Sequence, residues 1–321
     1  MTLAPYVQIL ARGPGRSRHL TRPEARAALG LILSGAAQPE AVGAVLMLMR
    51  FRGENADEIA GFVEAIRDSA AVWPGPAPAL DWPSYAAGRS RGLPWFLLAA
   101  RLVAAAGYPV LLHGWNSADG AGSVRDALAS AGIARAETLP GAADRLASAG
   151  IVYLPLERVA PEALRVLRLR EVLGLRSPVN TALRLFNPGG AACSVQGVFH
   201  PPYRGLQTDA AALLGQPDQM VLKGAGGEFE RAPAKEIALM GLRLGVPFDG
   251  LAPALLDAVG RLAEGPGADD LGALWAGTVR DAYAEAIVTG TAAVALMALG
   301  HAPGIEAADR LAQDLWNNRP V

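Results

Sequence analysis

Apolar residues between positions 5 and 69 recur with the period of amphipathic helices, and polar residues occupy the positions between them. Two helix starts carry capping-box spacing, in which a polar residue precedes a glutamate by three positions: Thr21 with Glu24, and Asn55 with Glu58. We therefore expect four short, closely spaced helices that form a small helical domain or half-domain.

A proline-rich stretch at residues 71–83, AVWPGPAPALDWP, cannot continue a helix and predicts a boundary. Beyond it, continuous apolar runs typical of buried parallel strands alternate with helical patterns. The strands are expected at Tyr108–Leu112, Ile151–Leu154, Ala192–Val198 and Met220–Leu222. The helices are expected at Leu93–Ala106, Ser123–Ala131, Leu206–Leu214, Pro253–Ala263, Asp270–Thr289, Thr291–Leu299 and Ile305–Trp316. This alternation predicts an α/β fold with a mostly parallel sheet covered by helices.

A strongly basic stretch lies in mid-chain, from Leu164 to Pro188. It has one acid, Glu171, against five arginines: Arg165, Arg168, Arg170, Arg176 and Arg184. Apolar residues at helical spacing and a break at Ser177–Pro178 predict a helical hairpin. Arginine forks suit phosphate and carboxylate groups because they donate parallel charge-assisted hydrogen bonds. A solvated charged helix face would explain the same pattern.

A second basic cluster precedes the second expected helix, and Glu24 is the only acid within it. Its members are Arg12, Arg16, Arg18, His19, Arg22 and Arg26. The turn-forming residues at 13–15 keep this segment open, so its arginines could follow a phosphate backbone. A solvated loop remains the alternative. The net charge of the chain is −1, so any attraction for nucleic acid must come from such local clusters.

Length and composition indicate an intracellular globular protein. A chain of 321 residues with 51% hydrophobic residues has room for two domains and their cores. Cys193 is the only cysteine, which excludes an internal disulfide framework. No apolar run is long enough to span a membrane, and the N-terminus lacks the basic region of a signal peptide. We expect a cytoplasmic protein.

Residues 50–62, 113–114 and 170–188 form three blocks that resemble, in the same order, those of anthranilate phosphoribosyltransferases. RFRGE at residues 50–54, followed by DEIAGF, is similar to the family's R-x-K-G-E-T…E-I-x-G segment. His113–Gly114 resembles K-H-G-N, and REVLGLRSPVN at residues 170–180, followed by Asn187–Pro188, resembles R-x-x-L-G-x-R-T-x-F-N…L-x-N-P. The resemblance implies a helical domain, residues 1–72 with 162–187, and an α/β domain, residues 78–161 with 188–321.

The donor-site segments depart from the family pattern. The family binds phosphoribosyl pyrophosphate (PRPP) with a G-T-G-G-D loop, whose bare backbone amides can approach the pyrophosphate. This chain has PSYAAGRSR at residues 83–91 instead. Trp115 and Asn116 stand where the family has asparagine and arginine, and the acidic pair for magnesium falls near Glu228 and Glu230, which are not adjacent. The resemblance therefore implies a degenerate donor site, comprising Ser84, Tyr85, Gly88, His113, Gly114, Trp115 and Asn116.

The altered loop is similar to that of the YbiB branch of the family, a second TrpD, whose members are associated with nucleic-acid binding. This resemblance implies a homodimer that binds DNA or RNA without sequence preference, and needs no cofactor. The groove would be lined by Arg12, Arg16, Arg18, Arg22, Arg89, Arg91, Arg165, Arg168, Arg170 and Arg176. Tyr85 and Trp115 would stack on bases or fill the vacated pyrophosphate site.

The alternative is a phosphoribosyltransferase that uses PRPP and Mg²⁺ with an unidentified aromatic acceptor. Arg170 matches the arginine that contacts anthranilate in the enzymes, so an acceptor pocket could persist. Asp119, Glu228 and Glu230 are then the candidate metal ligands, because Mg²⁺ prefers carboxylate oxygens. No catalytic residue is assigned.

Overall fold

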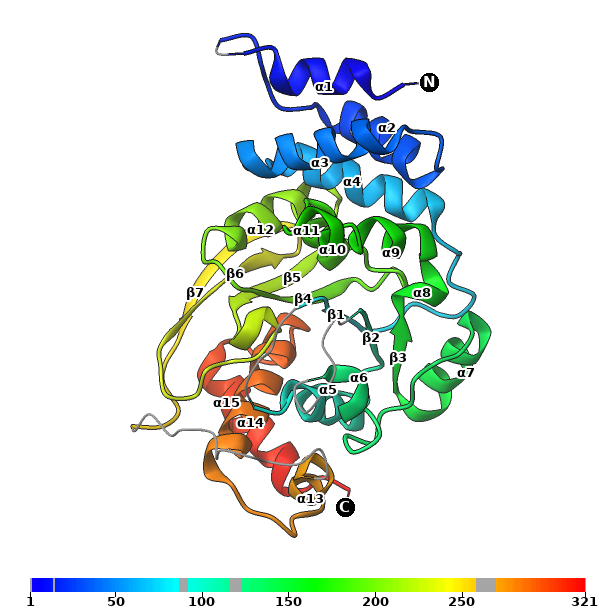
Figure 1. Cartoon of the computed structure of the whole chain (residues 1–321). Helices are drawn as coiled ribbons and strands as arrows, with labels where there is room; N and C mark the ends of the chain where they lie inside the picture. Colours follow the sequence, from blue (N-terminus) through cyan, green and yellow to red (C-terminus); the bar gives the residue numbers. More distant parts are fainter. Residues whose placement is uncertain (1, 14, 87–91, 116–122, 258–269, 321) are drawn as a thin grey trace.

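The chain folds into a helical part stacked on an α/β part (Figure 1). The computed structural model describes residues 2–13, 15–86, 92–115, 123–257 and 270–320. The segment around residue 170 returns to the helical part and lies directly beneath the N-terminal helices (Figure 1). The predicted fold class is confirmed: helices at the N-terminus are followed by an α/β unit with a mostly parallel sheet.

Four helices begin the chain within the described residues: α1 (Ala4–Ala11), α2 (Arg22–Leu33), α3 (Pro39–Arg52) and α4 (Ala56–Ser69). Both predicted capping boxes are confirmed, at the starts of α2 and α4. Helices α2 and α4 pack closely at Gly61, where an added Cβ atom would lie 2.3 Å from the carbonyl oxygen of Arg22. Only glycine permits this approach of the two backbones.

The described residues form a seven-stranded sheet in the order β3-β2-β1-β4-β5-β6-β7. Its strands are β1 (Leu80–Ser84), β2 (Val110–Gly114), β3 (Ile151–Pro155), β4 (Cys193–Val198), β5 (Asp218–Lys223), β6 (Ile237–Arg243) and β7 (Val246–Ala252). Strands β1 to β5 run parallel, and β6 and β7 add an antiparallel hairpin at one edge. The chain changes direction along the sheet between the neighbouring strands β1 and β4, which is where open α/β sheets bind ligands.

Helices cover both faces of the sheet. One face packs on α5 (Phe96–Ala105), α6 (Val124–Ala127), α13 (Asp270–Ala276), α14 (Ala282–Ala298) and α15 (Ile305–Asn317). The other packs on α7 (Leu139–Ala149), α8 (Leu156–Val159), α9 (Pro161–Leu167), α11 (Val179–Ala182) and α12 (Tyr203–Leu213). Strand residues alternate between these two cores: Leu112 belongs to the first and Leu111 to the second.

The basic stretch is more broken than the predicted hairpin of two helices. It contains the end of α9, the single turn α10 (Arg170–Leu173), α11 and a 3₁₀ turn at Leu183–Leu185. A further 3₁₀ turn, Ala225–Gly227, follows β5 later in the chain. Gly174 adopts a positive φ of 69° and ends α10, as expected for a left-handed helix cap.

Several predictions of secondary structure were wrong. Strand β1 contains Pro83 and was assigned to the linker, and the hairpin of β6 and β7 was not predicted. Residues 253–257 are not helical, and the rest of the predicted helix Pro253–Ala263 lies outside the described residues. The expected helix break near residue 290 is absent because α14 runs unbroken from Ala282 to Ala298. No helix in the described part of the chain is long and apolar enough to cross a membrane.

Candidate functional site

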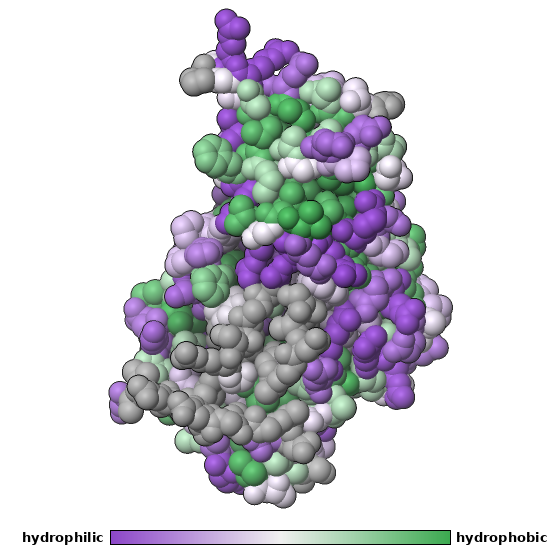
Figure 2. All heavy atoms as spheres, viewed as in Figure 1, coloured by the Kyte–Doolittle hydropathy of each residue, from purple (hydrophilic) through white to green (hydrophobic). Residues whose placement is uncertain are grey.

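A cavity of about 490 Å³ lies where the helical part meets the carboxyl ends of the central strands. Its described lining comes from the end of α3, from residues 170–184, from the segment after β4 with α12, and from Gly226 after β5. Figure 2 shows hydrophilic residues gathered at this junction between the helical part above and the α/β part below. The cavity therefore lies beside the carboxyl ends of β4 and β5, and both parts of the molecule contribute to it.

The described lining is strongly cationic. It contains four arginines, Arg50, Arg170, Arg176 and Arg184, against one carboxylate, Glu54. Burial lowers the pKa of Arg176, and its neighbours Arg170 and Arg50 lower it further. The Nη1 atom of Arg170 is buried and has no hydrogen-bond partner among the described residues. Guanidinium groups that repel one another around an open space favour a bound anion.

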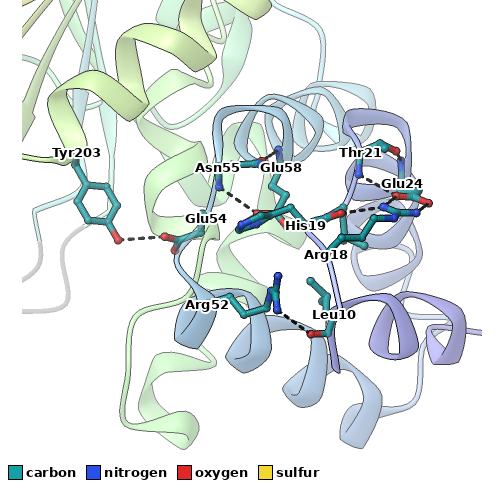
Figure 3. A network of polar contacts seen from close by, with 11 residues as sticks. Leu10, Arg18, His19, Thr21, Glu24, Arg52, Glu54, Asn55, Glu58 and Tyr203 are labelled. Atoms are coloured by element: carbon teal, nitrogen blue, oxygen red, sulfur yellow. Dashed lines mark hydrogen bonds and ion pairs between the residues drawn. The ribbon is translucent and has the colours of Figure 1, made fainter. Parts of the chain in front are cut away.

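One side of the cavity is held by contacts of Tyr203 on α12 with Arg50 on α3 and with Glu54 just after that helix. Figure 3 shows the contact between Tyr203 and Glu54. Arg50 Nη1 donates a hydrogen bond of 2.9 Å to the Tyr203 hydroxyl, which donates one of 3.1 Å to Glu54 Oε2. Burial raises the pKa of the Glu54 carboxyl above its usual value, while the Tyr203 hydroxyl opposes that shift. The phenol thus joins a cation and a carboxylate from the helical part to the α/β part.

The residues directly after β1 form a buried polar network with the end of β2. The Tyr85 side chain is 2% exposed, and its hydroxyl lies 2.8 Å from His113 Nδ1. His113 Nε2 lies 3.1 Å from Asp81 Oδ1, and Ser194 Oγ donates to the other oxygen of that carboxylate. Tyr85 is therefore part of a buried network and is not available for stacking on a base. Trp115, which ends this described segment, is partly buried.

The two glutamates proposed as metal ligands are engaged with the protein. Glu228 Oε1 accepts hydrogen bonds from Ser84 Oγ at 2.9 Å and from the Ala86 amide at 3.2 Å. Glu230 Oε2 accepts one of 3.1 Å from the Phe96 amide at the start of α5. Within the described residues no group of three or more His, Cys, Asp or Glu side chains is arranged to hold a metal ion. The third candidate ligand, Asp119, lies outside the described residues.

The other predicted arginines that the structure describes do not line this cavity. In the first cluster Arg12 bonds to Gln8, Arg18 to Glu24, and Arg22 to Glu64, while Arg16 is exposed. In the mid-chain stretch, Arg165 pairs with Glu162 and Arg168 with Glu171. Of the ten predicted arginines, the structure places Arg170 and Arg176 at the cavity. Gly88, Arg89, Arg91, Asn116 and Asp119 lie outside the described residues.

Sequence analysis missed several residues that line the cavity. Arg50 and Glu54 were noted only as part of the RFRGE resemblance, and that motif was the available signal. Arg184 was counted in the basic stretch but was not assigned to a site. Tyr203 gave no signal, because its role depends on the placement of α12 against α3.

Comparisons with known proteins give one consistent result. The helical bundle domain of the glycosyl transferase family matches residues 4–70. The anthranilate phosphoribosyltransferase of Rhizobium meliloti is 31% identical over 293 residues, covering 88% of this chain and 86% of the relative. That of Novosphingobium aromaticivorans is 31% identical over 227 residues, covering 70% and 69%.

Solved structures agree in fold. Anthranilate phosphoribosyltransferase from Thermus thermophilus superposes with a TM-score of 0.81 at 23% identity, covering 98% of this chain and 94% of that one. The structure of the Saccharomyces cerevisiae anthranilate phosphoribosyltransferase in complex with PRPP and Mg superposes with a TM-score of 0.77 at 16% identity, covering 98% of this chain and 93% of that one.

The nucleic-acid hypothesis is wrong. The relatives in sequence and the neighbours in structure named here are anthranilate phosphoribosyltransferases, whose printed names do not mention DNA or RNA. The structure supplies the physical reason, since most of the described candidate arginines are in ion pairs or bonds with neighbours instead of forming one groove. DNA and RNA are therefore removed as partners.

Proposed function

The chain belongs to the anthranilate phosphoribosyltransferase family, and on this premise we propose that it transfers a phosphoribosyl group to a negatively charged aromatic acceptor. One observation carries the proposal: the cavity between the helical part and the carboxyl ends of β4 and β5 is lined by four arginines within the described residues. In the reaction, a nitrogen of the acceptor attacks C1 of PRPP and a new C–N bond forms. The C1–O bond breaks, pyrophosphate leaves with the electron pair, and the nitrogen loses a proton to solvent.

The cavity offers complementary surfaces for such an acceptor. Arg170 and Arg176 supply forks suited to a carboxylate, and Leu175, Val198 and Phe199 add apolar surface for an aromatic ring. Arg50 is oriented by the Tyr203 hydroxyl and directs positive charge into the same space. Binding the acceptor next to the donor would supply orientation, which is a large part of catalysis in group transfer.

The segment after β1 supports placing the chain in a divergent branch of the family, the YbiB branch of the sequence resemblance. Ser84 and the buried Tyr85 stand where the family's loop has bare backbone. We therefore expect a donor-binding geometry different from that of the enzymes with a glycine-rich loop, and an acceptor that need not be anthranilate.

The test is release of pyrophosphate from PRPP in the presence of a panel of aromatic acids that includes anthranilate, with and without MgCl₂. We expect turnover with at least one acid. Arg170→Leu should lower kcat/KM by about tenfold or more, because a charge-assisted bidentate contact is lost. Arg168→Leu is the matched control, since Arg168 is exposed and pairs with Glu171. Absence of both turnover and PRPP binding would contradict the proposal.

A further inference from the structure

The arginines that line the cavity differ in how deeply they are buried. Arg170 and Arg176 are half-buried, whereas Arg184, in the 3₁₀ turn at Leu183–Leu185, is only 9% exposed. The Nη1 atom of Arg184 donates a hydrogen bond of 3.0 Å to the carbonyl oxygen of Asn180, one turn earlier in the chain. Because this bond holds the guanidinium against its own backbone, Arg184 supplies a fixed positive charge at the deep end of the cavity.

The described wall of the cavity offers these cations little negative charge. Glu54 is the one carboxylate in that wall, and it is joined through the Tyr203 hydroxyl to Arg50. The Nη1 atom of Arg170 is buried without a hydrogen-bond partner among the described residues, and the bond from Arg184 goes to a neutral carbonyl group. Since a buried charge is costly without a counter-charge, two cations at different depths favour a ligand with two separate anionic groups.

Two amide oxygens in the lining of the cavity have no hydrogen-bond partner among the described residues. They are Oδ1 of Asn180 and Oε1 of Gln207, and these two residues are 5% and 1% exposed. The orientation of the Gln207 amide is set by its nitrogen, which donates a hydrogen bond of 3.1 Å to the carbonyl oxygen of Thr181. Buried oxygens need a hydrogen-bond donor, and a ligand with an N–H group beside one of its acid groups would supply it.

We propose that the acceptor is an aromatic amine with two acid groups on opposite sides of its ring. One acid group binds Arg184, and the amino group beside it donates to the oxygens of Asn180 and Gln207. The other acid group binds the less buried Arg170 and Arg176. The inference rests on the proposed function for the reaction, and it deepens it by naming the class of acceptor and by making Arg184 a residue that determines specificity. Arg184 lies between the motif positions matched to the family, whereas Arg170 and Arg176 are among them.

The test is calorimetric titration of the full-length protein with anthranilate, 2-aminoterephthalate and 3-aminophthalate. Each titration is done on the protein alone and with sodium pyrophosphate and MgCl₂, which can occupy the donor site without allowing turnover. Anthranilate has one acid group, 2-aminoterephthalate has two on opposite sides of the ring, and its isomer 3-aminophthalate has two side by side. We expect 2-aminoterephthalate to bind about tenfold or more tightly than either of the others, because it alone reaches cations at both depths. The two isomers carry the same charge, so a difference between them reports geometry.

Arg184→Gln removes the deep charge, while the new amide can still donate to the Asn180 carbonyl oxygen. In this variant the preference for 2-aminoterephthalate over 3-aminophthalate should fall to about twofold or less, because one of the two anionic contacts is lost. Arg168→Leu, at an exposed ion pair with Glu171, should keep the preference of the unchanged protein. Thermal unfolding shows whether each variant folds. If Arg184→Gln does not fold, the comparison of the two isomers on the unchanged protein still decides the matter.

The outcomes distinguish this inference from the proposed function. Equal binding of the two isomers, or a preference that persists in Arg184→Gln, overturns the inference and leaves phosphoribosyl transfer to a single-acid acceptor standing. Absence of binding by all three amines also overturns the inference, and it overturns the proposed function as well if PRPP is neither bound nor turned over. A preference for 2-aminoterephthalate that requires Arg184 supports the inference.

Discussion

Arg18 stabilises a helix start in this protein instead of contacting a phosphate backbone. Its two terminal nitrogens lie 2.6 and 2.7 Å from the two oxygens of Glu24, which also accepts a hydrogen bond of 2.9 Å from the Thr21 amide (Figure 3). The bond to Arg18 lowers the pKa of Glu24 from 4.5 to about 2. The sequence could not distinguish these two roles of Arg18, because a cluster of arginines suits both an ion pair at a helix start and contact with phosphate groups.

Glu24→Gln should lower the free energy of unfolding at pH 7 by about 1 kcal/mol, mainly because the capping box at the start of α2 is weakened. The exposed ion pair adds little. Since folding lowers the pKa of Glu24, the contribution of its carboxylate is fully present above about pH 4.5 and is lost as the pH falls through about 2. Urea unfolding of both proteins at pH 7 and at pH 3 should show the difference shrinking at the lower pH. An equal difference in the free energy of unfolding at pH 7 and at pH 3 would contradict this role of the Glu24 carboxylate.

The elements that sequence analysis predicted correctly are those with local signals. The capping boxes at Thr21 and Asn55 fix the starts of α2 and α4 because both partners of each bond lie within one helical turn. Strands β2 and β3 are buried along their full length and contain the apolar runs Val110–Leu112 and Ile151–Leu154. Strand β7 is mostly exposed, so its sequence lacks such a run. The cavity could not be predicted because it depends on how distant elements meet.

The close packing of α2 against α4 depends on the absence of a side chain at Gly61. In Gly61→Ala, the added methyl group would overlap the Arg22 carbonyl and lie 2.9 Å from the Ala25 side chain. We expect the free energy of unfolding to fall by about 1–3 kcal/mol, because backbone atoms of a packed helix cannot move aside cheaply. Gly30→Ala is the matched control within α2, since its Cβ would meet nothing within 4 Å. Gly30→Ala should raise the free energy of unfolding by about 0.5–1 kcal/mol.

Urea unfolding distinguishes these two glycines. If Gly61→Ala proved as stable as Gly30→Ala, the close approach of α2 to α4 described here would be wrong.

At the scale of the whole molecule, the helical part and the α/β part are joined by polar contacts as well as by packing. Arg22 at the start of α2 donates a hydrogen bond of 2.6 Å to the carbonyl oxygen of Leu213 at the end of α12. Tyr203 on α12 completes the junction at the cavity. A ligand in the cavity would therefore touch both parts and stabilise the chain as a unit.

Tyr203→Phe removes the hydroxyl between Arg50 and Glu54 and keeps the ring. We expect the free energy of unfolding at pH 7 to fall by about 1–2 kcal/mol, because both half-buried charges lose a hydrogen bond. Burial raises the pKa of Glu54 and the Tyr203 hydroxyl lowers it, so the substitution should raise it further. With a folded-state pKa above the unfolded value, the stability that Glu54 contributes is present at low pH and is lost as the pH rises through the raised value.

The deficit of Tyr203→Phe should therefore be larger at pH 7 than at pH 4, because acid protonates Glu54 and a neutral carboxyl loses less when the phenol hydroxyl is removed. Urea unfolding at pH 7 and at pH 4 measures this loss in the free energy of unfolding. Tyr6→Phe is the control, because no hydrogen bond of the Tyr6 hydroxyl occurs within the described residues. A deficit that grew on acidification would show that Glu54 is not the group that responds to the loss of the phenol. The bridge across the cavity would then have to be assigned to Arg50 alone.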